Sequence, residues 1–286
     1  MALSIGIVGA GTMGAGIAHA AALHHCNVQL YDINEEVIRT GINKITAELK
    51  KSVEKNKISD EEMKTALGRI KKRTNINDLD TCDIIIEAVL EDLRVKKDLF
   101  KKLDQIAHHT AILATNTSSL SISSIASAAK KPERVIGLHF FNPAYSIKLV
   151  EVVRGKLTSD STLQQTLEIV RQIGKKAVVT TDSPGFIVNR ISRQFYGEAF
   201  RLAGEGVASI QEIDRIVRKS GGFKSGPFEQ LDSIGIEDDL MIAEAIFERT
   251  YRDPRFQPSP LQKQMVEAGL FGKASKKGFY NYDEQK

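Results

Sequence analysis

Apolar residues form short continuous runs through the first two thirds of the chain, and helix-period segments separate these runs. The runs rich in valine and isoleucine are Ile5–Val8, Val28–Tyr31, Ile84–Glu87, Ile112–Ala114, Val135–His139, Leu149–Val153 and Ala177–Thr180. Because polar residues do not alternate within them, these runs are typical of strands in a sheet that is covered on both faces. The amphipathic segments between them are Asn34–Lys57, Leu93–Ala107 and Ser161–Ile173. This alternation predicts an α/β fold with a doubly wound, mostly parallel, Rossmann-like sheet.

The pattern changes after Ser183, where Pro184-Gly185 interrupts the chain. Helical stretches follow at Ile187–Leu202, Ile210–Lys219, Phe228–Thr250 and Pro260–Ala268, with no convincing strand until the very end. We therefore expect two domains, a sheet domain at 1–183 and an all-helical C-terminal domain at 184–286. The charged segment 34–70 is unusually long for one crossover, so we expect a helical hairpin there that leaves the body of the first domain.

Composition narrows the class of protein. The 286 residues carry a net charge of +4, with 42% hydrophobic and 27% charged residues, as in an ordinary globular protein. The basic residues are spread along the chain, so we expect no nucleic-acid partner. No apolar run approaches the roughly 20 residues that cross a bilayer, and no signal peptide precedes the first strand, so we expect a cytoplasmic protein with no membrane partner. Cys26 and Cys82 lack CxxC spacing, which favours buried reduced thiols over a disulfide or metal ligands.

A glycine-rich turn follows the first predicted strand and opens a helix. It reads Gly9-Ala10-Gly11-Thr12-Met13-Gly14. In such a motif the glycines allow the tight turn, the approach of a pyrophosphate and the close packing of helix on sheet, while the helix N-terminus attracts phosphate. Asp32 ends the next strand, where a carboxylate can bind ribose hydroxyls and repel a 2′-phosphate. The motif therefore predicts bound NAD rather than NADP, and the alternative is a glycine turn without a ligand.

A histidine and a glutamate lie in two consecutive apolar runs. His139 ends one run before a bend, at the carboxyl end of the sheet where ligands bind in this architecture. Glu151 interrupts the next run, and an acid there is costly to bury unless it is paired. We expect the two side chains to pair, so that the imidazole takes the proton of an alcohol while hydride leaves for a nicotinamide. The alternative is an edge-strand glutamate facing water and a core histidine bonded to backbone.

Two further polar segments are candidates for the site. Thr115-Asn116-Thr117-Ser118-Ser119 follows a predicted strand and supplies hydroxyls and an amide that can hold a substrate oxygen or the nicotinamide. A simple helix cap is the alternative interpretation. Asn189 is a polar amide on the first helix of the second domain, where it either faces the cleft or bonds a neighbouring helix.

Together these segments resemble the L-3-hydroxyacyl-CoA dehydrogenase family, and within it the bacterial 3-hydroxybutyryl-CoA dehydrogenases. The resemblance covers nearly the whole chain, in GAGTMGAGIA, EAVLEDLRVKKDLF, ATNTSSLSI, GLHFFNPA, KLVEVV, DSPGFIVNR, GPFEQLD and GFYNY. HFFNP together with SPGFIVNR is highly specific. The resemblance implies a Rossmann-like NAD domain, an all-helical domain that forms a homodimer, and an active site between the domains.

Matching motifs imply a role for each site residue. His139 is the catalytic base and Glu151 its electrostatic partner. Ser118 contacts substrate and nicotinamide, and Asn189 completes the site. The implied cofactor pocket consists of Gly9, Ala10, Gly11, Thr12, Met13, Gly14, Asp32, Glu91, Lys96, Asn116, Ser118 and Asn142.

The family binds CoA partly through the hairpin after the second strand. Here that helix is basic between residues 50 and 57, which suits CoA phosphates, and Lys55 is our candidate. A solvated charged face is the alternative. Near the C-terminus, Ala274 replaces a lysine that reaches the cofactor in the family, and Lys273 or Lys276 is the candidate to substitute for it.

The resulting hypothesis is reversible, NAD-dependent interconversion of a short-chain (S)-3-hydroxyacyl-CoA and its 3-ketoacyl-CoA. One alternative keeps the fold but takes a sugar acid as substrate, as in gulonate-type dehydrogenases. The other is an NAD-binding structural or regulatory protein that has lost catalysis.

Overall fold

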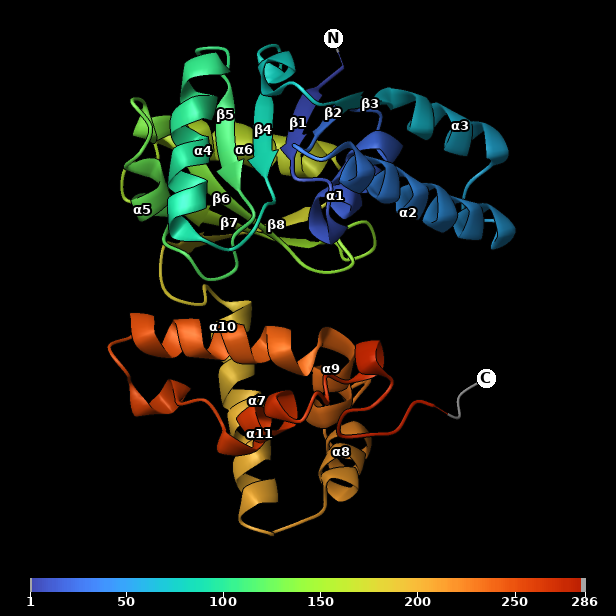
Figure 1. Ribbon diagram of the computed structural model, residues 1–286, viewed down its shortest axis with the longest axis vertical. Coiled ribbons are helices and arrows are strands. Elements are labelled where there is room, and N and C mark those ends of the chain that lie inside the picture. The colour runs from blue at the N-terminus through green and yellow to red at the C-terminus, as the bar shows by residue number, and fades with distance from the viewer. Residues whose placement is uncertain (1, 284–286) are drawn as a thin grey trace. The chain divides into compact units, whose positions relative to one another are not determined.

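The chain divides between Ser183 and Pro184 into two compact units, each with its own core. This is seen in the computed structural model, which describes residues 2–283 (Figure 1). The first unit contains a sheet and helices, and the second is built from helices.

An eight-stranded sheet forms the centre of the first unit, in the order β3-β2-β1-β4-β5-β6-β7-β8. Its strands are β1 (Ser4–Val8), β2 (Asn27–Tyr31), β3 (Ile70–Arg73), β4 (Ile84–Glu87), β5 (Ile112–Thr115), β6 (Val135–Phe140), β7 (Leu149–Arg154) and β8 (Lys176–Thr181). The strands from β3 to β6 are parallel, β7 runs antiparallel to β6, and β8 is parallel to β7. The predicted Rossmann-like sheet is confirmed.

Helices cover both faces of the sheet. The helices α1 (Thr12–Leu23), α2 (Glu35–Glu54) and α6 (Asp160–Gln172) share one core with alternate strand residues, whereas α4 (Leu93–Ile106) and α5 (Ile122–Ala126) share the other (Figure 1). In β4, for example, Ile84 and Ile86 belong to the first core and Ile85 to the second. This explains why the central strands are mostly apolar, without alternating polar residues. The edge strand β8 is less well covered, because Val178 and Val179 are exposed.

A hairpin of α2 and α3 (Asp60–Arg69) extends from the sheet beside β3 (Figure 1). A capping box begins α3, in which Ser59 and Glu62 exchange backbone-to-side-chain hydrogen bonds of 2.7 and 3.1 Å. The strand β3 that follows was not among the predicted strands. Its sequence, IKKR, is short and basic, and it joins the sheet as an edge strand through its backbone alone.

The second unit contains the helices α7 (Val188–Gly204), α8 (Ile210–Lys219), α9 (Pro227–Ile234), α10 (Ile236–Arg249) and α11 (Pro260–Glu267). The helical stretch expected over Phe228–Thr250 consists of two helices, α9 and α10. Gly235 adopts a φ of 110° between α9 and α10, which is incompatible with a continuous helix. Up to Asp283, the residues after α11 form isolated bridges rather than a strand.

A buried carboxylate fastens the C-terminal segment to these helices. Asp232, on α9, accepts hydrogen bonds of 2.9 Å from the backbone amides of Phe279 and Tyr280, and one of 3.0 Å from the hydroxyl of Tyr282. The ring of Phe279 packs on Phe228 with centroids 4.8 Å apart. The GFYNY segment is therefore an integral part of the second core.

Candidate active site

The glycine turn connects β1 to α1, and its three glycines lie in different surroundings. A Cβ on Gly9, whose φ is 101°, would lie 2.5 Å from the carbonyl oxygen of Ala88, and a Cβ on Gly14 would overlap the carbonyl oxygen of Gly9. By contrast, a Cβ on Gly11 would meet no atom within 4 Å. No side chain caps α1, so the first-turn N–H groups remain available to an anion. This combination fits a pyrophosphate.

Asp32 lies just after β2 and supports the same turn. Its carboxylate oxygens accept hydrogen bonds from the amides of Ala10 at 2.9 Å and Asn34 at 3.1 Å. Each oxygen retains capacity for a second donor, such as a ribose hydroxyl. The residues present therefore fit NAD. The hydrogen bond from Ala10 shows that Asp32 also stabilises the glycine turn, which the sequence did not predict.

Strands β6 and β7 place His139 directly opposite Glu151. The Nδ1 atom of His139 lies 2.7 Å from Oε2 of Glu151, and the two residues are only 5% and 1% exposed. Because a carboxylate only accepts, Nδ1 carries the hydrogen and Nε2 carries the lone pair of the neutral ring. Phe141 packs its ring edge-to-face on the imidazole, 4.5 Å between centroids. The structure thus joins the predicted pair in a buried setting.

Asn116 connects the end of β5 to this pair. Its Oδ1 accepts a hydrogen bond of 2.9 Å from the backbone amide of Phe140, immediately after His139. The side chain thus extends the β5–β6 contact beyond the last paired residues, Thr115 and Gly137. Asn142 is exposed on the following bend and is joined to Pro143 by a cis peptide bond.

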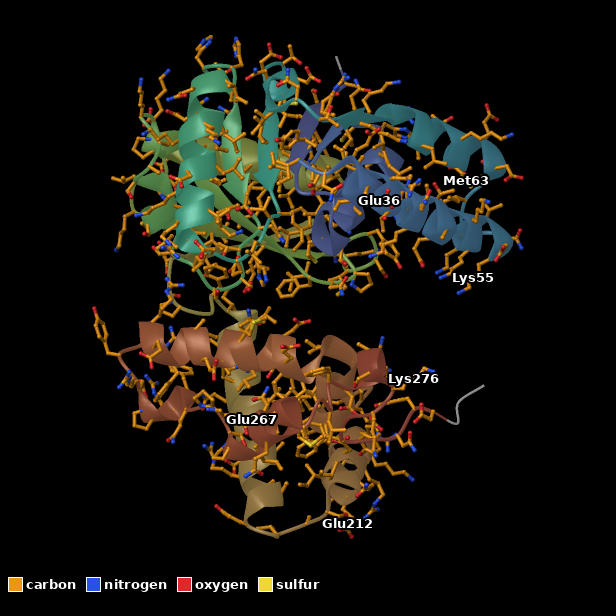
Figure 2. The ribbon with its side chains drawn as sticks, in the orientation of Figure 1. Glu36, Lys55, Met63, Glu212, Glu267 and Lys276 are labelled. Atoms are coloured by element: carbon orange, nitrogen blue, oxygen red, sulfur yellow. The ribbon has the colours of Figure 1, made fainter. Side chains whose placement is uncertain are left out.

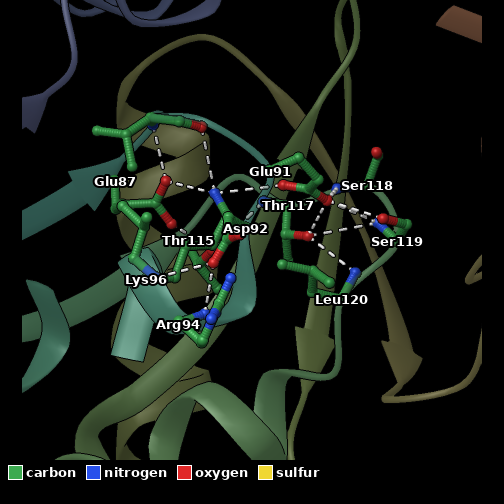
Figure 3. Close-up of polar contacts among 12 residues, drawn as sticks. Glu87, Glu91, Asp92, Arg94, Lys96, Thr115, Thr117, Ser118, Ser119 and Leu120 are labelled. Atoms are coloured by element: carbon green, nitrogen blue, oxygen red, sulfur yellow. Dashed lines mark hydrogen bonds and ion pairs between the residues drawn. The ribbon is translucent and has the colours of Figure 1, made fainter. Parts of the chain in front are cut away.

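A buried ion pair lies at the ends of β4 and β5, where Glu87 and Thr115 are the last strand residues (Figure 3). The Nζ atom of Lys96 is 2.5 Å from Oε1 of Glu87, and both side chains are essentially inaccessible. Glu87 also accepts from the hydroxyl of Thr115 and the amide of Val89, both at 2.7 Å. Glu87 was not among the predicted site residues, although it is an acid in an apolar strand, as Glu151 is.

Glu91 connects this ion pair to the Ser118 turn, by which we mean residues 117–120. Its Oε2 lies 3.3 Å from Nζ of Lys96. Its Oε1 accepts from the hydroxyls of Thr117 and Ser119, the latter at 2.9 Å, and from the amides of Ser118 and Ser119, both at 3.2 Å (Figure 3). Burial opposes ionisation, but Lys96 and the two hydroxyls outweigh it and hold the pKa of the Glu91 carboxyl below its usual range. Among residues 2–283, the Ser118 hydroxyl itself has no hydrogen-bond partner.

Two predicted site residues lie on other elements. Lys55 is the exposed C-cap of α2 at the far end of the hairpin, where neighbouring Lys51 pairs with Glu48 at 2.7 Å (Figure 2). Asn189 lies in the first turn of α7 in the second unit, and its Nδ2 is buried without a hydrogen-bond partner in the described part of the chain. The ammonium of Lys273 lies 5.7 Å from the centre of the Tyr282 ring within the second unit.

A further contact joins the hairpin to the bend after His139. The ring of His19, buried on α1, stacks on Tyr145 with centroids 4.6 Å apart. The hydroxyl of Tyr145 in turn donates a 2.9 Å hydrogen bond to Glu48 of α2. Burial is the main reason that the pKa of His19 is lowered to about 4.

Fold and site together define a nicotinamide-dependent dehydrogenase, with NAD as its cofactor. The sequence model of the 3-hydroxyacyl-CoA dehydrogenase NAD binding domain matches residues 4–183. The model of the C-terminal domain of 3-hydroxyacyl-CoA dehydrogenase matches residues 185–282. The chain belongs to the 3-hydroxyacyl-CoA dehydrogenase family, and the resemblance seen in the sequence is confirmed.

Individual relatives cover almost the entire chain. A 3-hydroxyadipyl-CoA dehydrogenase of Escherichia coli K12 is 42% identical over 98% of the chain, which spans 59% of that longer protein. A probable 3-hydroxybutyryl-CoA dehydrogenase of Bacillus subtilis is 38% identical, covering 98% of the chain and 97% of the relative. The crystal structure of (S)-3-hydroxybutyryl-CoA dehydrogenase from Ralstonia eutropha has a TM-score of 0.94 at 38% identity, over 99% of this chain and all of that one.

In residues 2–283, no helix has the length and apolar character needed to span a membrane. The same residues contain no cluster of three or more histidine, cysteine or acidic side chains arranged to hold a metal ion. Cys26 and Cys82 are free thiols buried in the first unit.

Proposed function

We propose that this protein catalyses the reversible NAD-dependent oxidation of an (S)-3-hydroxyacyl-CoA to a 3-ketoacyl-CoA, with a short acyl chain such as 3-hydroxybutyryl. The observation that carries the proposal is the buried His139–Glu151 pair on β6 and β7. These strands belong to the same sheet as β1, which the glycine turn follows. The names of the relatives from Bacillus subtilis and Ralstonia eutropha support the short chain. The Escherichia coli relative is named a 3-hydroxyadipyl-CoA dehydrogenase, so assays with different acyl groups test the chain length.

The proposed chemistry follows from the tautomer of His139. The hydroxyl proton of the substrate passes to Nε2, and the adjacent carboxylate of Glu151 stabilises the imidazolium that forms. When bound, NAD supplies the nicotinamide ring that takes up the hydride from the same substrate carbon. In the reverse direction the imidazolium returns its proton to the oxygen of the ketone.

Several other residues would hold the reactants. The glycine turn and Asp32 suit the pyrophosphate and the adenosine ribose. We propose that the Ser118 hydroxyl and, from the second unit, the Asn189 amide hydrogen-bond the reacting oxygen. Lys55 would attract CoA phosphates through its charge. As the family resemblance implies, we further propose a homodimer formed through the second unit and a cytoplasmic location; sedimentation analysis tests the dimer.

The decisive assay mixes the purified protein with NADH and acetoacetyl-CoA and follows absorbance at the nicotinamide band. We expect the absorbance to fall, and to fall much more slowly when NADPH replaces NADH. His139→Ala should lower turnover by at least about a hundredfold, the usual scale for loss of a general base, without weakening NADH binding. His109→Ala, at an exposed histidine, is the matched control. Near-normal turnover by His139→Ala would refute the proposed base, and activity on a sugar acid alone would refute the CoA substrate.

A further inference from the structure

We propose that Lys175 is a positioning residue for His139, because its ammonium group holds the bend that follows His139 in place. By the bend we mean residues 141–148, which connect β6 to β7. The inference rests on the proposed function, since it takes His139 to be the base of the reaction. Lys175 acts through the backbone of the bend.

The ammonium group of Lys175 gathers three backbone carbonyl groups of the bend. Its Nζ atom donates hydrogen bonds to the carbonyl oxygens of Ala144 at 2.6 Å, Ile147 at 2.8 Å and Tyr145 at 3.3 Å. These bonds use all three hydrogens of an ammonium group. The amide of Ile147 also donates to the carbonyl oxygen of Pro143 at 3.1 Å, which tightens the bend. The bend therefore closes around a single cation.

The burial of Lys175 makes these contacts necessary. The residue is only 7% exposed, and no ion pair among residues 2–283 includes it. Burial, and to a smaller extent the nearby charge of Lys148, lowers the pKa of the Lys175 ammonium. A buried charge without a counter-ion is destabilising unless hydrogen bonds compensate for the lost water. The carbonyl groups of the bend provide this compensation, and an apolar side chain would leave them without that donor.

Lys175 is itself fixed by the elements on either side of it. Its backbone amide donates to the carbonyl oxygen of Val170, in the last turn of α6, at 3.0 Å. The next residue, Lys176, begins β8, and its amide donates to the carbonyl oxygen of Lys148 at 2.7 Å. One short segment therefore holds the last residue of the bend by its backbone and the middle of the bend by a side chain.

The bend is directly connected to the His139–Glu151 pair. In the β6–β7 ladder, these two residues form the second pair from the bend. Phe141, the first residue of the bend, packs its ring against the imidazole with centroids 4.5 Å apart. Opening of the bend would fray this end of the ladder and release the ring contact. Because a misplacement of about 1 Å can cost roughly a hundredfold in rate, the anchoring of the bend matters for the reaction.

The same part of the bend also packs on α1, the helix that follows the glycine turn (Figure 1). A Cβ on Gly16 would lie 3.1 Å from the Cβ of Ala144, and the ring of His19 stacks on Tyr145. Lys175 binds the carbonyl groups of these same two bend residues. The ammonium group thus fixes the bend against the helix whose N-terminus we expect to bind the cofactor phosphates.

Lys175→Met tests the inference, because it removes the ammonium group and keeps most of the apolar stem. With acetoacetyl-CoA and saturating NADH, we expect the kcat of the folded protein to fall roughly ten- to a hundredfold. The Kd of NADH, from nicotinamide fluorescence, should change less than about threefold. A kcat within about twofold of the unmodified enzyme, or a Kd that weakens in proportion to kcat, would overturn the inference.

Arg134→Met is the matched control for the loss of a buried cation. Arg134 is also 7% exposed, donates to the carbonyl oxygens of Asp104, His108 and Ala111, and pairs with the Asp104 carboxylate. It directly precedes β6, at the end of this strand away from the bend. We expect the kcat of folded Arg134→Met to stay within about threefold of the unmodified enzyme. Equal losses of kcat in the two variants would show that Lys175 merely stabilises the fold, and would overturn the inference.

Lys175→Gln keeps the inference testable if Lys175→Met does not fold. Its amide has two hydrogens for three carbonyl groups, and its stem is shorter. We expect kcat to fall by roughly three- to tenfold with an unchanged Kd for NADH, and a kcat within about twofold would overturn the inference. Added to His139→Ala, either Lys175 variant should lower the residual kcat by less than a further factor of about two, because the group it positions is gone. Losses that multiply would contradict a role through His139.

A measurement independent of turnover keeps this inference separate from the proposed function. Amide hydrogen exchange at Phe140, next to His139, and at Ile147, within the bend, should be faster in Lys175→Met and unchanged in Arg134→Met. Unchanged exchange in Lys175→Met would overturn the positioning role. Faster exchange in a protein that does not use CoA thioesters would refute the proposed function and leave the anchoring of the bend by Lys175 standing.

Discussion

Replacing Glu151 by glutamine isolates the charge of the catalytic pair from its geometry. The amide oxygen of glutamine can still accept the Nδ1 hydrogen of His139, so the ring should keep its tautomer and its place. What disappears is a negative charge 2.7 Å from a ring that becomes positive during the reaction. We therefore expect a loss of rate with little change in NADH binding.

The structure sets the size of this effect. Across 2.7 Å, opposite charges attract by about 1.5 kcal/mol in water and by about 6 kcal/mol at the effective dielectric constant of a protein. Hydrogen bonds to charged groups contribute about 1.5–3 kcal/mol net, and the pair is almost fully buried, so kcat should fall roughly ten- to a hundredfold. Steady-state kinetics with acetoacetyl-CoA at saturating NADH measures this, with exposed Glu133→Gln as the control. A kcat for Glu151→Gln within about twofold of the unmodified enzyme would show that the carboxylate does not stabilise the imidazolium.

Three further predictions address the cofactor, pH and the second unit. Asp32→Ala should erode the preference for NAD over NADP, measured as the ratio of kcat/KM values; an unchanged ratio would remove Asp32 from the ribose site. Because burial lowers the pKa of His19 to about 4, the folded chain binds a proton less readily than the unfolded chain, and the free energy of unfolding should fall between pH 6.5 and 4 by up to about 3 kcal/mol. In urea unfolding, the free energy of unfolding of His19→Gln should fall less over this pH range than that of the unmodified protein. An equal fall in both proteins would contradict the prediction. Asp232→Asn places an NH₂ group among three donors and should lower the free energy of unfolding of the second unit by about 2–3 kcal/mol. A lower melting temperature and faster proteolysis after Gly278 should accompany this loss. A free energy of unfolding within about 0.5 kcal/mol of the unmodified protein, the range of a neutral surface change, would refute the prediction.

The sequence was informative where one local signal was sufficient. The glycine turn, the apolar strands and the pairing of His139 with Glu151 each depend on a short motif or on the cost of burying an isolated acid. Strand β3 was missed because an edge strand needs only backbone partners, which residue pattern does not reveal. The break at Gly235 was missed because a glycine inside a helical pattern is usually tolerated, and only its φ of 110° ends the helix. The contacts of Glu87 with Lys96 and Thr115, and of Glu91 with Ser119, join residues 9 to 28 positions apart on different elements, so only the folded chain shows them.

The hydrogen bond between Tyr145 and Glu48 divides the hairpin into two mechanically different parts. The base of α2, up to Glu48, is coupled to the bend after His139, so a shift of this part would be transmitted to the active site. Beyond Glu48, the side-chain hydrogen bonds of the described residues stay within the hairpin, while Leu49 and Ala66 pack into the core of the first unit. Exposed charges on the outer arm, such as Lys55, can therefore be changed without breaking a hydrogen bond to the bend after His139, so the CoA binding that we propose for this arm can be altered separately from the proposed reaction.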